Sequence, residues 1–239
     1  MKNIIYEGDC LDFMRTMPDS CVDAVVTDPP FGIGHYYAGN PEQFSNPDDY
    51  GVWIQSIMAE CGRVVRPGGF FAVWQAQLYF RHFWNWFGND IHIYCAAKNF
   101  VQLRKTPVNY AYDPVVLWYK PGAPLRPQKP RRNVDFFVSN TASLVSKPNR
   151  PERGHPCPRP LDVVWALVDN FVIPGGIVLD PFLGSGTTAI ACLRTGRHII
   201  GCETNSDYIR IAKSRLKAEA PGTAVEYLKK ETVRRPGGA

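Results

Sequence analysis

Hydrophobic residues fall into two alternating patterns along most of the chain. Short β-branched or aromatic runs, typical of buried strands, cover residues 4–6, 22–26, 70–74, 91–97, 115–119, 177–179 and 199–202. Apolar positions at helical spacing cover residues 11–14, 53–61, 80–87, 163–171, 187–194 and 208–218. Strands that alternate with helices indicate right-handed crossover units. We therefore expect an α/β fold with a mostly parallel twisted sheet and helices on both faces.

Prolines and glycines mark where these elements end. Pro29-Pro30 cannot continue a central strand, so the second strand is predicted to end at Asp28. Arg66-Pro67-Gly68-Gly69 is predicted to stop a helix before the next strand, and the tail from Lys229 is expected to fray. Ligands of parallel sheets bind at the carboxyl ends of the strands, which points to the loops after Asp9, Asp28 and Asp180.

Length and composition restrict the class of protein. The 239 residues, 45% hydrophobic and 21% charged, are typical of a globular protein and predict a single domain over residues 1–239. No apolar run approaches the ~18 residues of a membrane span. The N-terminus carries acidic residues where a signal peptide needs an apolar stretch. These features exclude membrane and secreted proteins, and we expect a cytoplasmic one.

The cysteines give no sign of a disulfide framework or a zinc site. Seven of them, at 10, 21, 61, 95, 157, 192 and 202, are widely spaced and form no Cys-x-x-Cys pair. We expect reduced thiols that pack as small apolar residues, and no bound metal.

Positive charge is concentrated in one segment. The net charge is +5, yet residues 121–160 alone carry eight Lys and Arg against two acidic residues, together with 9 of the 21 prolines. A basic, Pro-rich stretch on a nearly neutral body favours a phosphate-binding arm or loop, although a solvated surface loop has the same composition.

A glycine-rich loop follows one of the predicted strands and opens a helix. It reads Asp180-Pro-Phe-Leu-Gly-Ser-Gly-Thr-Thr188, and Gly184, Gly186 and Ala189 satisfy a G-x-G-x-x-A pattern. Glu203 ends the next strand about 20 residues on, where a ribose-binding carboxylate is expected. No Lys follows Gly186, so this is not the phosphate-binding loop of nucleoside triphosphatases. The pattern indicates an adenosine-containing cofactor and leaves both nicotinamide and S-adenosylmethionine open.

A second motif separates these two cofactors. In Thr27-Asp-Pro-Pro-Phe-Gly32, a carboxylate at a strand end is followed by two stiff prolines and an aromatic ring. With the glycine-rich loop further along, the chain resembles the β-class amino-methyltransferases, which modify exocyclic amines of adenine or cytosine in DNA. The resemblance covers about residues 3–218 and implies a Rossmann-like methyltransferase fold. It places a target-recognition segment, residues 121–153, between the two motifs.

The resemblance also implies a role for individual residues. Gly8-Asp9-Cys10-Leu11 looks like the strand end that holds the cofactor adenine, and Gly201-Cys-Glu-Thr-Asn205 like the ribose-binding strand. The segment from His155 to Leu161 resembles one that lines the methionine end of the cofactor, with Arg159 where the family usually has Lys. The implied S-adenosyl-L-methionine site comprises Asp9, Cys10, His155, Asp180, Phe182, Gly184, Gly186, Thr187, Thr188, Glu203 and Asn205.

Catalysis is implied for Asp28, Pro29, Pro30 and Phe31, on a base taken out of the duplex. Phe31 would stack on that base, while the Asp28 carboxylate and the Pro29 carbonyl would accept hydrogen bonds from its amine. Double-stranded DNA would contact Arg126, Lys129, Arg131 and Arg132. The family's cytosine enzymes more often carry Ser before the two prolines, so adenine N6 is preferred. Cytosine N4, RNA adenine methylation and, remotely, a nicotinamide-dependent oxidoreductase stay as alternatives. The resemblance also implies a bacterial or phage origin, and the short recognition segment favours a homodimer.

Overall fold

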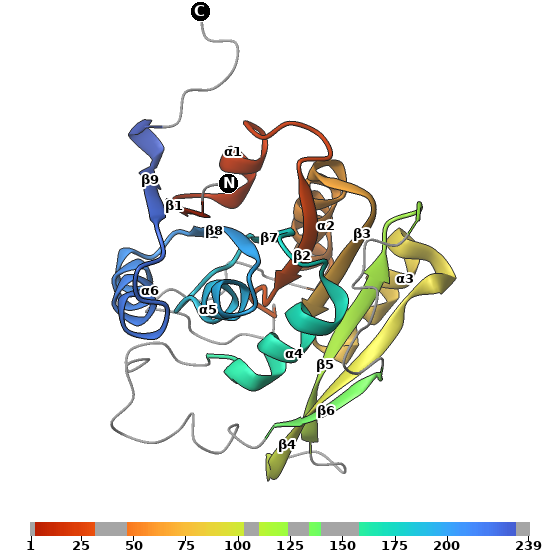
Figure 1. The fold of residues 1–239 in the computed structure, drawn as a ribbon. Coiled ribbons are helices and arrows are strands. Elements are labelled where there is room, and N and C mark those ends of the chain that lie inside the picture. The colour runs from red at the N-terminus through yellow and green to blue at the C-terminus, as the bar shows by residue number, and fades with distance from the viewer. Residues whose placement is uncertain (1–2, 32–46, 103–109, 124–133, 140–157, 233–239) are drawn as a thin grey trace, which may run out of the picture.

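One mixed sheet forms the centre of the computed structural model (Figure 1), which describes residues 3–31, 47–102, 110–123, 134–139 and 158–232. Within these residues nine strands pair in the order β6-β4-β5-β3-β2-β7-β8-β1-β9. The strands are β1 (Asn3–Glu7), β2 (Val22–Thr27), β3 (Val65–Trp74), β4 (His92–Gln102), β5 (Tyr110–Tyr119), β6 (Phe136–Ser139), β7 (Ile177–Asp180), β8 (His198–Glu203) and β9 (Val225–Lys229).

Most neighbouring strands run parallel, as the alternating pattern predicted. The six strands from β3 to β9 in the sheet order pair in parallel throughout, and β6 pairs in parallel with β4. The exception is β5, which runs antiparallel to both β3 and β4. The predicted Rossmann-like α/β fold is therefore confirmed, with one antiparallel strand, β5, inserted between β3 and β4.

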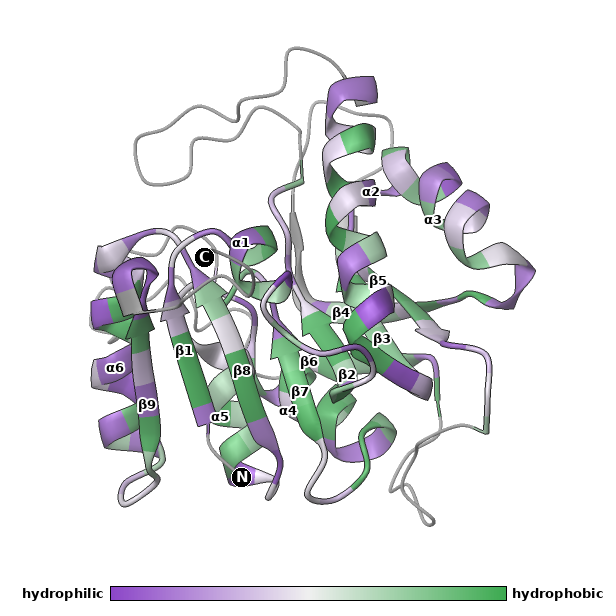
Figure 2. Ribbon diagram, turned by 90° about the horizontal axis from the view of Figure 1, so that it is seen from above, coloured by the Kyte–Doolittle hydropathy of each residue, from purple (hydrophilic) through white to green (hydrophobic). Residues whose placement is uncertain are grey.

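Helices cover both faces of the sheet. On one face lie α1 (Cys10–Met14), α2 (Pro47–Val64) and α3 (Phe80–Phe87), and on the other α4 (Leu161–Phe171), α5 (Thr187–Arg194) and α6 (Ser206–Glu219). Short 3₁₀ turns occupy Gln77–Tyr79, Gly88–Asp90 and Lys230–Thr232. Alternate residues of strand β3 belong to the hydrophobic cores on opposite faces of the sheet. Phe70 and Trp74 pack towards α4, whereas Phe71 packs towards α2. Figure 2 shows the hydrophobic residues concentrated along the central strands.

The predicted turn at residues 66–69 lies inside strand β3. Pairing with β2 runs from Val65 and resumes at Phe70 after a shift in register, so the Pro-Gly-Gly sequence forms an irregularity in the strand rather than its beginning. Pro67 has no N–H to offer, and Gly68 adopts a φ of 76° that glycine tolerates. Lys120 then pairs with Gly69 through its backbone N–H, at 2.8 Å from the carbonyl oxygen. The two strands β6 and β9 are further elements that the hydrophobic pattern did not predict.

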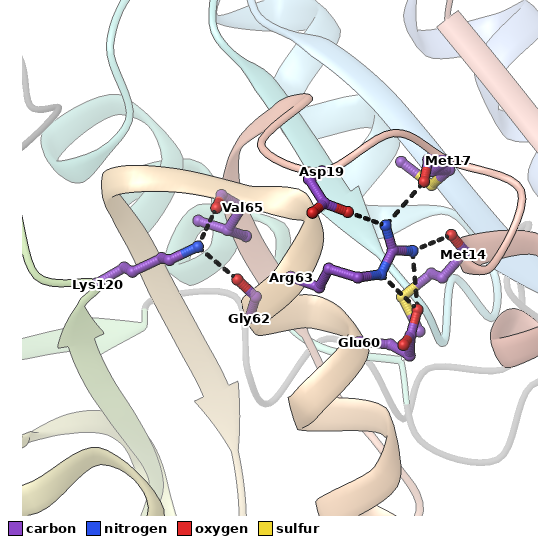
Figure 3. Close-up of polar contacts among 8 residues, drawn as sticks. All are labelled: Met14, Met17, Asp19, Glu60, Gly62, Arg63, Val65 and Lys120. Atoms are coloured by element: carbon purple, nitrogen blue, oxygen red, sulfur yellow. Dashed lines mark hydrogen bonds and ion pairs between the residues drawn. The ribbon is translucent and has the colours of Figure 1, made fainter.

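Two basic side chains hold the carboxyl-terminal ends of the first two helices (Figure 3). Arg63 donates to the carbonyl oxygen of Met14, the last residue of α1, at 2.6 Å and to that of Met17, just after the helix, at 2.9 Å. Lys120 Nζ lies 2.7 Å from the carbonyl oxygen of Gly62 near the end of α2. Carbonyls at helix ends have no partner within the helix, so these cations satisfy them and fix α1 and α2 against the sheet.

Strand β1, the first in the chain order of the described strands, lies in the sheet between β8 and β9, the last two. β1 pairs with β8 on one side and β9 on the other. The side chain of Asn3 connects both neighbours, because its amide donates to the Ala224 carbonyl at 3.0 Å and its oxygen accepts from the backbone N–H of Ile199 at 3.2 Å. None of the helices in the described part of the chain is both long and apolar enough to cross a bilayer.

Candidate active site

Four acidic residues from separate motifs lie along the same edge of the sheet. Strands β2, β7, β8 and β1 are consecutive and parallel, so their carboxyl ends meet at that edge. Asp28 follows β2, Asp180 ends β7, Glu203 ends β8, and Asp9 follows β1. This is the position at which open α/β sheets bind ligands.

The loop after β1 is tightly folded around glycine. Asp9 caps the start of α1, with its carboxylate 3.1 Å from the backbone nitrogen of Asp12, and Cys10 is buried as the first helical residue. The backbone N–H of Gly8 donates to the Glu203 carbonyl at 2.9 Å, which joins this loop to the end of β8. A Cβ atom at Gly8 would lie 2.6 Å from the Tyr6 ring, so a side chain does not fit there.

The glycine-rich loop leads directly into α5. Gly184 and Gly186 have φ angles of 52° and 82°, in the left-handed region that glycine enters freely. A Cβ at Gly186 would lie 3.0 Å from that of Ala212 on α6, so the loop and α6 are in close contact. Thr187 and Thr188 form the buried first turn of α5. The positive end of this helix dipole faces the sheet edge, as a cofactor carboxylate would require.

Asp180 connects the glycine-rich loop to strand β2, which leads into the Asp-Pro-Pro-Phe motif. Its Oδ1 accepts hydrogen bonds from Thr27 Oγ1 at 2.7 Å and from the backbone N–H of Phe182 at 3.1 Å. Burial raises the pKa of the Asp180 carboxyl to about 6. Thr27 precedes Asp28 directly, so one hydrogen bond couples the two motifs. The sequence gives no local signal for this contact, because the two residues are 153 positions apart.

The carboxylate of Glu203 is held by backbone N–H groups. Gly184 donates to Oε2 at 2.9 Å and Asn205 donates to Oε1 at 2.8 Å, and burial raises the pKa of the carboxyl. Each oxygen keeps lone pairs for further donors such as ribose hydroxyls. The side-chain oxygen of Asn205 caps α6 by accepting from Asp207 and Tyr208. Phe182 packs with its ring centre 5.5 Å from that of Trp53.

The Asp-Pro-Pro-Phe motif at residues 28–31 places a carboxylate beside an aromatic ring. Asp28 follows β2 with 27% of its side chain exposed, Pro29 is buried, and Phe31 is partly buried against the core on the α4 side. Arg159, immediately before Pro160 and α4, forms a two-point ion pair with Asp28, with Nε–Oδ2 and Nη2–Oδ1 distances of 2.6 and 2.8 Å. Burial raises the pKa of Asp28, and Arg159 opposes that effect. The Arg159 guanidinium carbon also lies 5.1 Å from the Phe31 ring centre.

Several predicted residues lie outside the described part of the chain. They are His155 of the cofactor set and the DNA-contacting set Arg126, Lys129, Arg131 and Arg132. Of the predicted recognition segment 121–153, the structure describes residues 121–123 and 134–139, the latter including strand β6 beside β4. For the remainder, the assignments stay predictions.

Cysteine chemistry has no support at this site. Among the described cysteines, Cys61, Cys192 and Cys202 are buried and have pKa values raised by burial, and burial raises the pKa of Cys10 to about 12. Such thiols stay protonated and unreactive. Within the described residues no group of three or more His, Cys, Asp or Glu side chains is arranged to hold a metal ion.

Comparison with known proteins identifies the family. A family model described as a DNA methylase matches residues 22–214. The type II methyltransferase M.ScaI of Streptomyces caespitosus is 27% identical over 253 residues, which cover 91% of this chain and 82% of that protein.

Two solved structures share the fold at lower identity. The M1.HpyAVI–SAM complex superimposes with a TM-score of 0.65 at 23% identity, over 89% of this chain and 100% of that one. The cytosine-N4-specific PvuII DNA methyltransferase superimposes with a TM-score of 0.72 at 16% identity, over 98% of this chain and 97% of that one. The family match spans both the Asp28 motif and the glycine-rich loop, and the protein therefore belongs to the N6/N4 amino-methyltransferase family of DNA methylases.

Proposed function

We propose that this protein methylates the exocyclic N6 amine of adenine in double-stranded DNA, at specific sites, after extruding the base from the duplex. The observation that carries the proposal is the position of Asp28 and Phe31, which lie at the sheet edge that also holds Glu203 and the glycine-rich loop. An acceptor for an amine, a stacking surface and a nucleoside-binding carboxylate are thereby brought together.

S-adenosyl-L-methionine is the methyl donor, and it supplies a methyl group on a positively charged sulfur. The residues at the edge suit it: Glu203 has acceptor capacity for the ribose hydroxyls and Asp9 for the adenine amine. Gly184 and Gly186 adopt the left-handed φ angles that this loop requires, and a Cβ at Gly186 would press on Ala212 of α6. The N-terminus of α5 favours a carboxylate, such as that of the methionine part.

Asp28 and the Pro29 carbonyl act on the target amine. By accepting its hydrogen bonds they draw the nitrogen lone pair out of conjugation with the ring and toward the methyl group. A nitrogen–carbon bond then forms as the sulfur–carbon bond breaks, with the electron pair of that bond remaining on sulfur. The proton lost by the nitrogen passes to the Asp28 carboxylate. Positioning and electrostatics supply the rate enhancement, with no covalent enzyme intermediate.

The choice of adenine rests on Asp rather than Ser before the two prolines. Cytosine N4 and RNA adenine are therefore outcomes to be tested. The enzyme is incubated with methyl-labelled S-adenosylmethionine and either unmethylated duplex DNA or RNA, and the modified nucleoside is identified after digestion. We expect N6-methyldeoxyadenosine. N4-methyldeoxycytidine, or label only in RNA, would contradict the assignment.

Two variants separate chemistry from cofactor binding. Asp28→Ala should abolish methyl transfer while S-adenosylmethionine affinity, measured by calorimetry, changes little. Glu203→Ala should weaken that affinity by about 1.5–3 kcal/mol, the range for hydrogen bonds to a charged group. A fully active Asp28→Ala enzyme would rule out this mechanism, and an unchanged affinity in a folded Glu203→Ala protein would remove Glu203 from the cofactor site.

A further inference from the structure

Four charged side chains form a continuous series of alternating sign that ends at the catalytic carboxylate. Arg159 contacts Asp28 through Nε and Nη2, and its Nη1 donates to Asp113 Oδ2 at 2.9 Å. The other oxygen of Asp113 pairs with Lys98 Nζ at 2.7 Å. The four residues come from the loop after β2, the residue before the α4 cap, and strands β5 and β4.

We propose that Arg159, held in place by Asp113 and Lys98, is a positioning residue that orients Asp28 for the target amine and keeps it ionised. This inference rests on the proposed role of Asp28 in methyl transfer. It assigns to the antiparallel strands β4 and β5 a part in catalysis, through residues that lie outside the catalytic and cofactor motifs.

The geometry of the contact requires an arginine. Three nitrogens of one guanidinium serve two carboxylates, an arrangement that the planar fork of Arg permits and the single nitrogen of Lys does not. The side chain of Arg159 is only 11% exposed, whereas that of Asp28 is 27% exposed. Asp113, with 22% of its side chain exposed, holds the same guanidinium through Nη1, so a largely buried Arg159 is fixed by carboxylates from two different elements.

Arg159 leaves room for the target amine on Asp28. An ionised carboxylate has about four acceptor positions, and the two-point contact uses one on each oxygen. The remaining positions can accept from an amine. The same guanidinium lies 5.1 Å from the centre of the Phe31 ring, so one residue orders both the acceptor and the stacking surface for the base.

The charges around Asp28 determine its protonation. Burial raises its pKa and so does the neighbouring Asp113, while Arg159 lowers it. Asp180, at the end of β7, is close enough that the Asp28 charge raises the Asp180 pKa. Removing the Arg159 charge should therefore raise the pKa of Asp28. As the pH falls, the Asp28 carboxylate would then become protonated, and stop accepting from the target amine, at a higher pH than in the wild type.

The test compares Arg159→Met with Arg159→Lys, and uses Arg210→Met as the matched control. Arg210 is an exposed residue of α6 that forms an ion pair with Asp207, one turn earlier on the same helix. The pH dependence of kcat is measured on DNA, together with S-adenosylmethionine affinity. Arg159→Met should lower kcat and move the acid limb of its pH profile upward by about one unit or more, since an adjacent Arg lowers a carboxyl pKa by 1–3 units. Arg159→Lys should keep the acid limb near its wild-type position and restore part of kcat.

A direct titration makes the test independent of turnover. With ¹³C-carboxyl-labelled aspartate, the Asp28 signal is assigned by its absence in Asp28→Asn, and that of Asp180 by Asp180→Asn. The pKa of Asp28 should rise by about one unit or more in Arg159→Met and stay unchanged in Arg210→Met. A wild-type enzyme without the expected methylation would overturn the proposed function, and the titration would still decide the role of Arg159.

Two results would overturn the inference. One is an Asp28 pKa and pH profile unaffected by Arg159→Met. The other is an Arg159→Met enzyme with unchanged kcat and a lower KM for DNA, because the guanidinium would then be a competitor occupying the place of the extruded base. Should Arg159→Met fail to fold, Arg159→Lys and Asp113→Asn decide. We expect Asp113→Asn to lower kcat, because the Arg159 guanidinium loses its second carboxylate partner. S-adenosylmethionine affinity should stay within about threefold.

Discussion

Asp180 has 2% of its surface exposed, although it carries a carboxyl group at the end of a strand. The pKa of that carboxyl is raised from 3.8 to about 6 because burial disfavours the ionised form. The folded protein therefore binds this proton more tightly than the unfolded chain does. Stability from this group is fully present below about pH 4 and is lost as pH rises to about 6.

Replacement of Asp180 by Asn should remove this pH dependence. The amide oxygen can still accept from Thr27 and Phe182, and no buried charge forms at neutral pH. At 1.36 kcal/mol per pKa unit, the difference in unfolding free energy between Asp180→Asn and wild type should grow by about 3 kcal/mol in favour of the variant between pH 4 and pH 7. Urea unfolding at several pH values measures it. A difference that does not change with pH would show that the carboxyl titrates normally.

The residues of the site were predictable only where a local motif carries them. Asp28, Phe31 and the glycines of the loop stand in short patterns at strand ends, and parallel topology then brings them to one edge. Arg159 was placed by resemblance near the cofactor, but its contact with Asp28 joins residues 131 positions apart. Asp113 and Lys98 lie on strands whose pattern indicates only burial, so the sequence alone does not indicate a role for their charges.

At the scale of elements, α6 supports the glycine-rich loop through a buried residue, Arg215. Arg215 donates from Nη1 to the Ser185 carbonyl at 2.9 Å and to the hydroxyls of Ser185 and Thr187 at 3.0 Å each. It is 2% exposed, and its Nε lies 3.3 Å from Glu219 on the same helix. The loop between β7 and α5 is therefore tied to α6 as well as to Glu203.

Arg215→Met should loosen that loop, although Arg215 is not among the residues proposed to contact the cofactor. Loss of hydrogen bonds from a charged donor should cost about 1.5–3 kcal/mol of stability, and S-adenosylmethionine affinity should fall about tenfold or more. Thermal unfolding and calorimetry measure the two effects. Arg210→Met, on the exposed face of the same helix, is the control and should alter neither. An Arg215→Met protein with wild-type affinity would show that the loop keeps its shape unaided.

Element boundaries were predicted well where the apolar pattern is strong and poorly where special backbone conformations occur. The helix at residues 187–194 has the predicted bounds, because its glycine-rich start and periodic apolar face agree. At residues 67–69 the turn-forming composition was accommodated within a strand, since β2 and the Lys120 region supply partners on both sides. Strand β9 has exposed and polar residues and depends on pairing with β1, which no local pattern reveals.

At the scale of the whole molecule, charge is distributed unevenly. Residues 121–160 carry eight basic and two acidic residues, within a net charge of +5. In β-class chain order the target-recognition region is expected at residues 121–153, within this stretch, and we propose that this basic segment contacts DNA phosphates. Arg131 and Arg132 are adjacent in it and lie outside the described residues.

The double variant Arg131→Ala, Arg132→Ala should weaken DNA binding and its dependence on salt. Each lost phosphate contact should flatten the log–log slope by about 0.9, so one or two contacts are expected to disappear. S-adenosylmethionine affinity should be unchanged. The matched control replaces Arg210 and Lys217, two exposed basic residues of α6, by Ala. A titration at several salt concentrations with an unchanged slope would indicate a solvated loop that contacts no DNA.

The position of β1 in the sheet determines at what stage of synthesis the site can form. β1 leaves the ribosome before its sheet neighbours β8 and β9, which end at residues 203 and 229. Until then both backbone edges of β1 lack their partners, and Asn3 lacks the contacts that join the two sides. A chain whose translation stops early, even after α4, therefore has no complete strand end at Asp9 or Glu203. We therefore expect chains terminated before the end of β8, which lack Glu203, to bind no methyl donor and to transfer no methyl group.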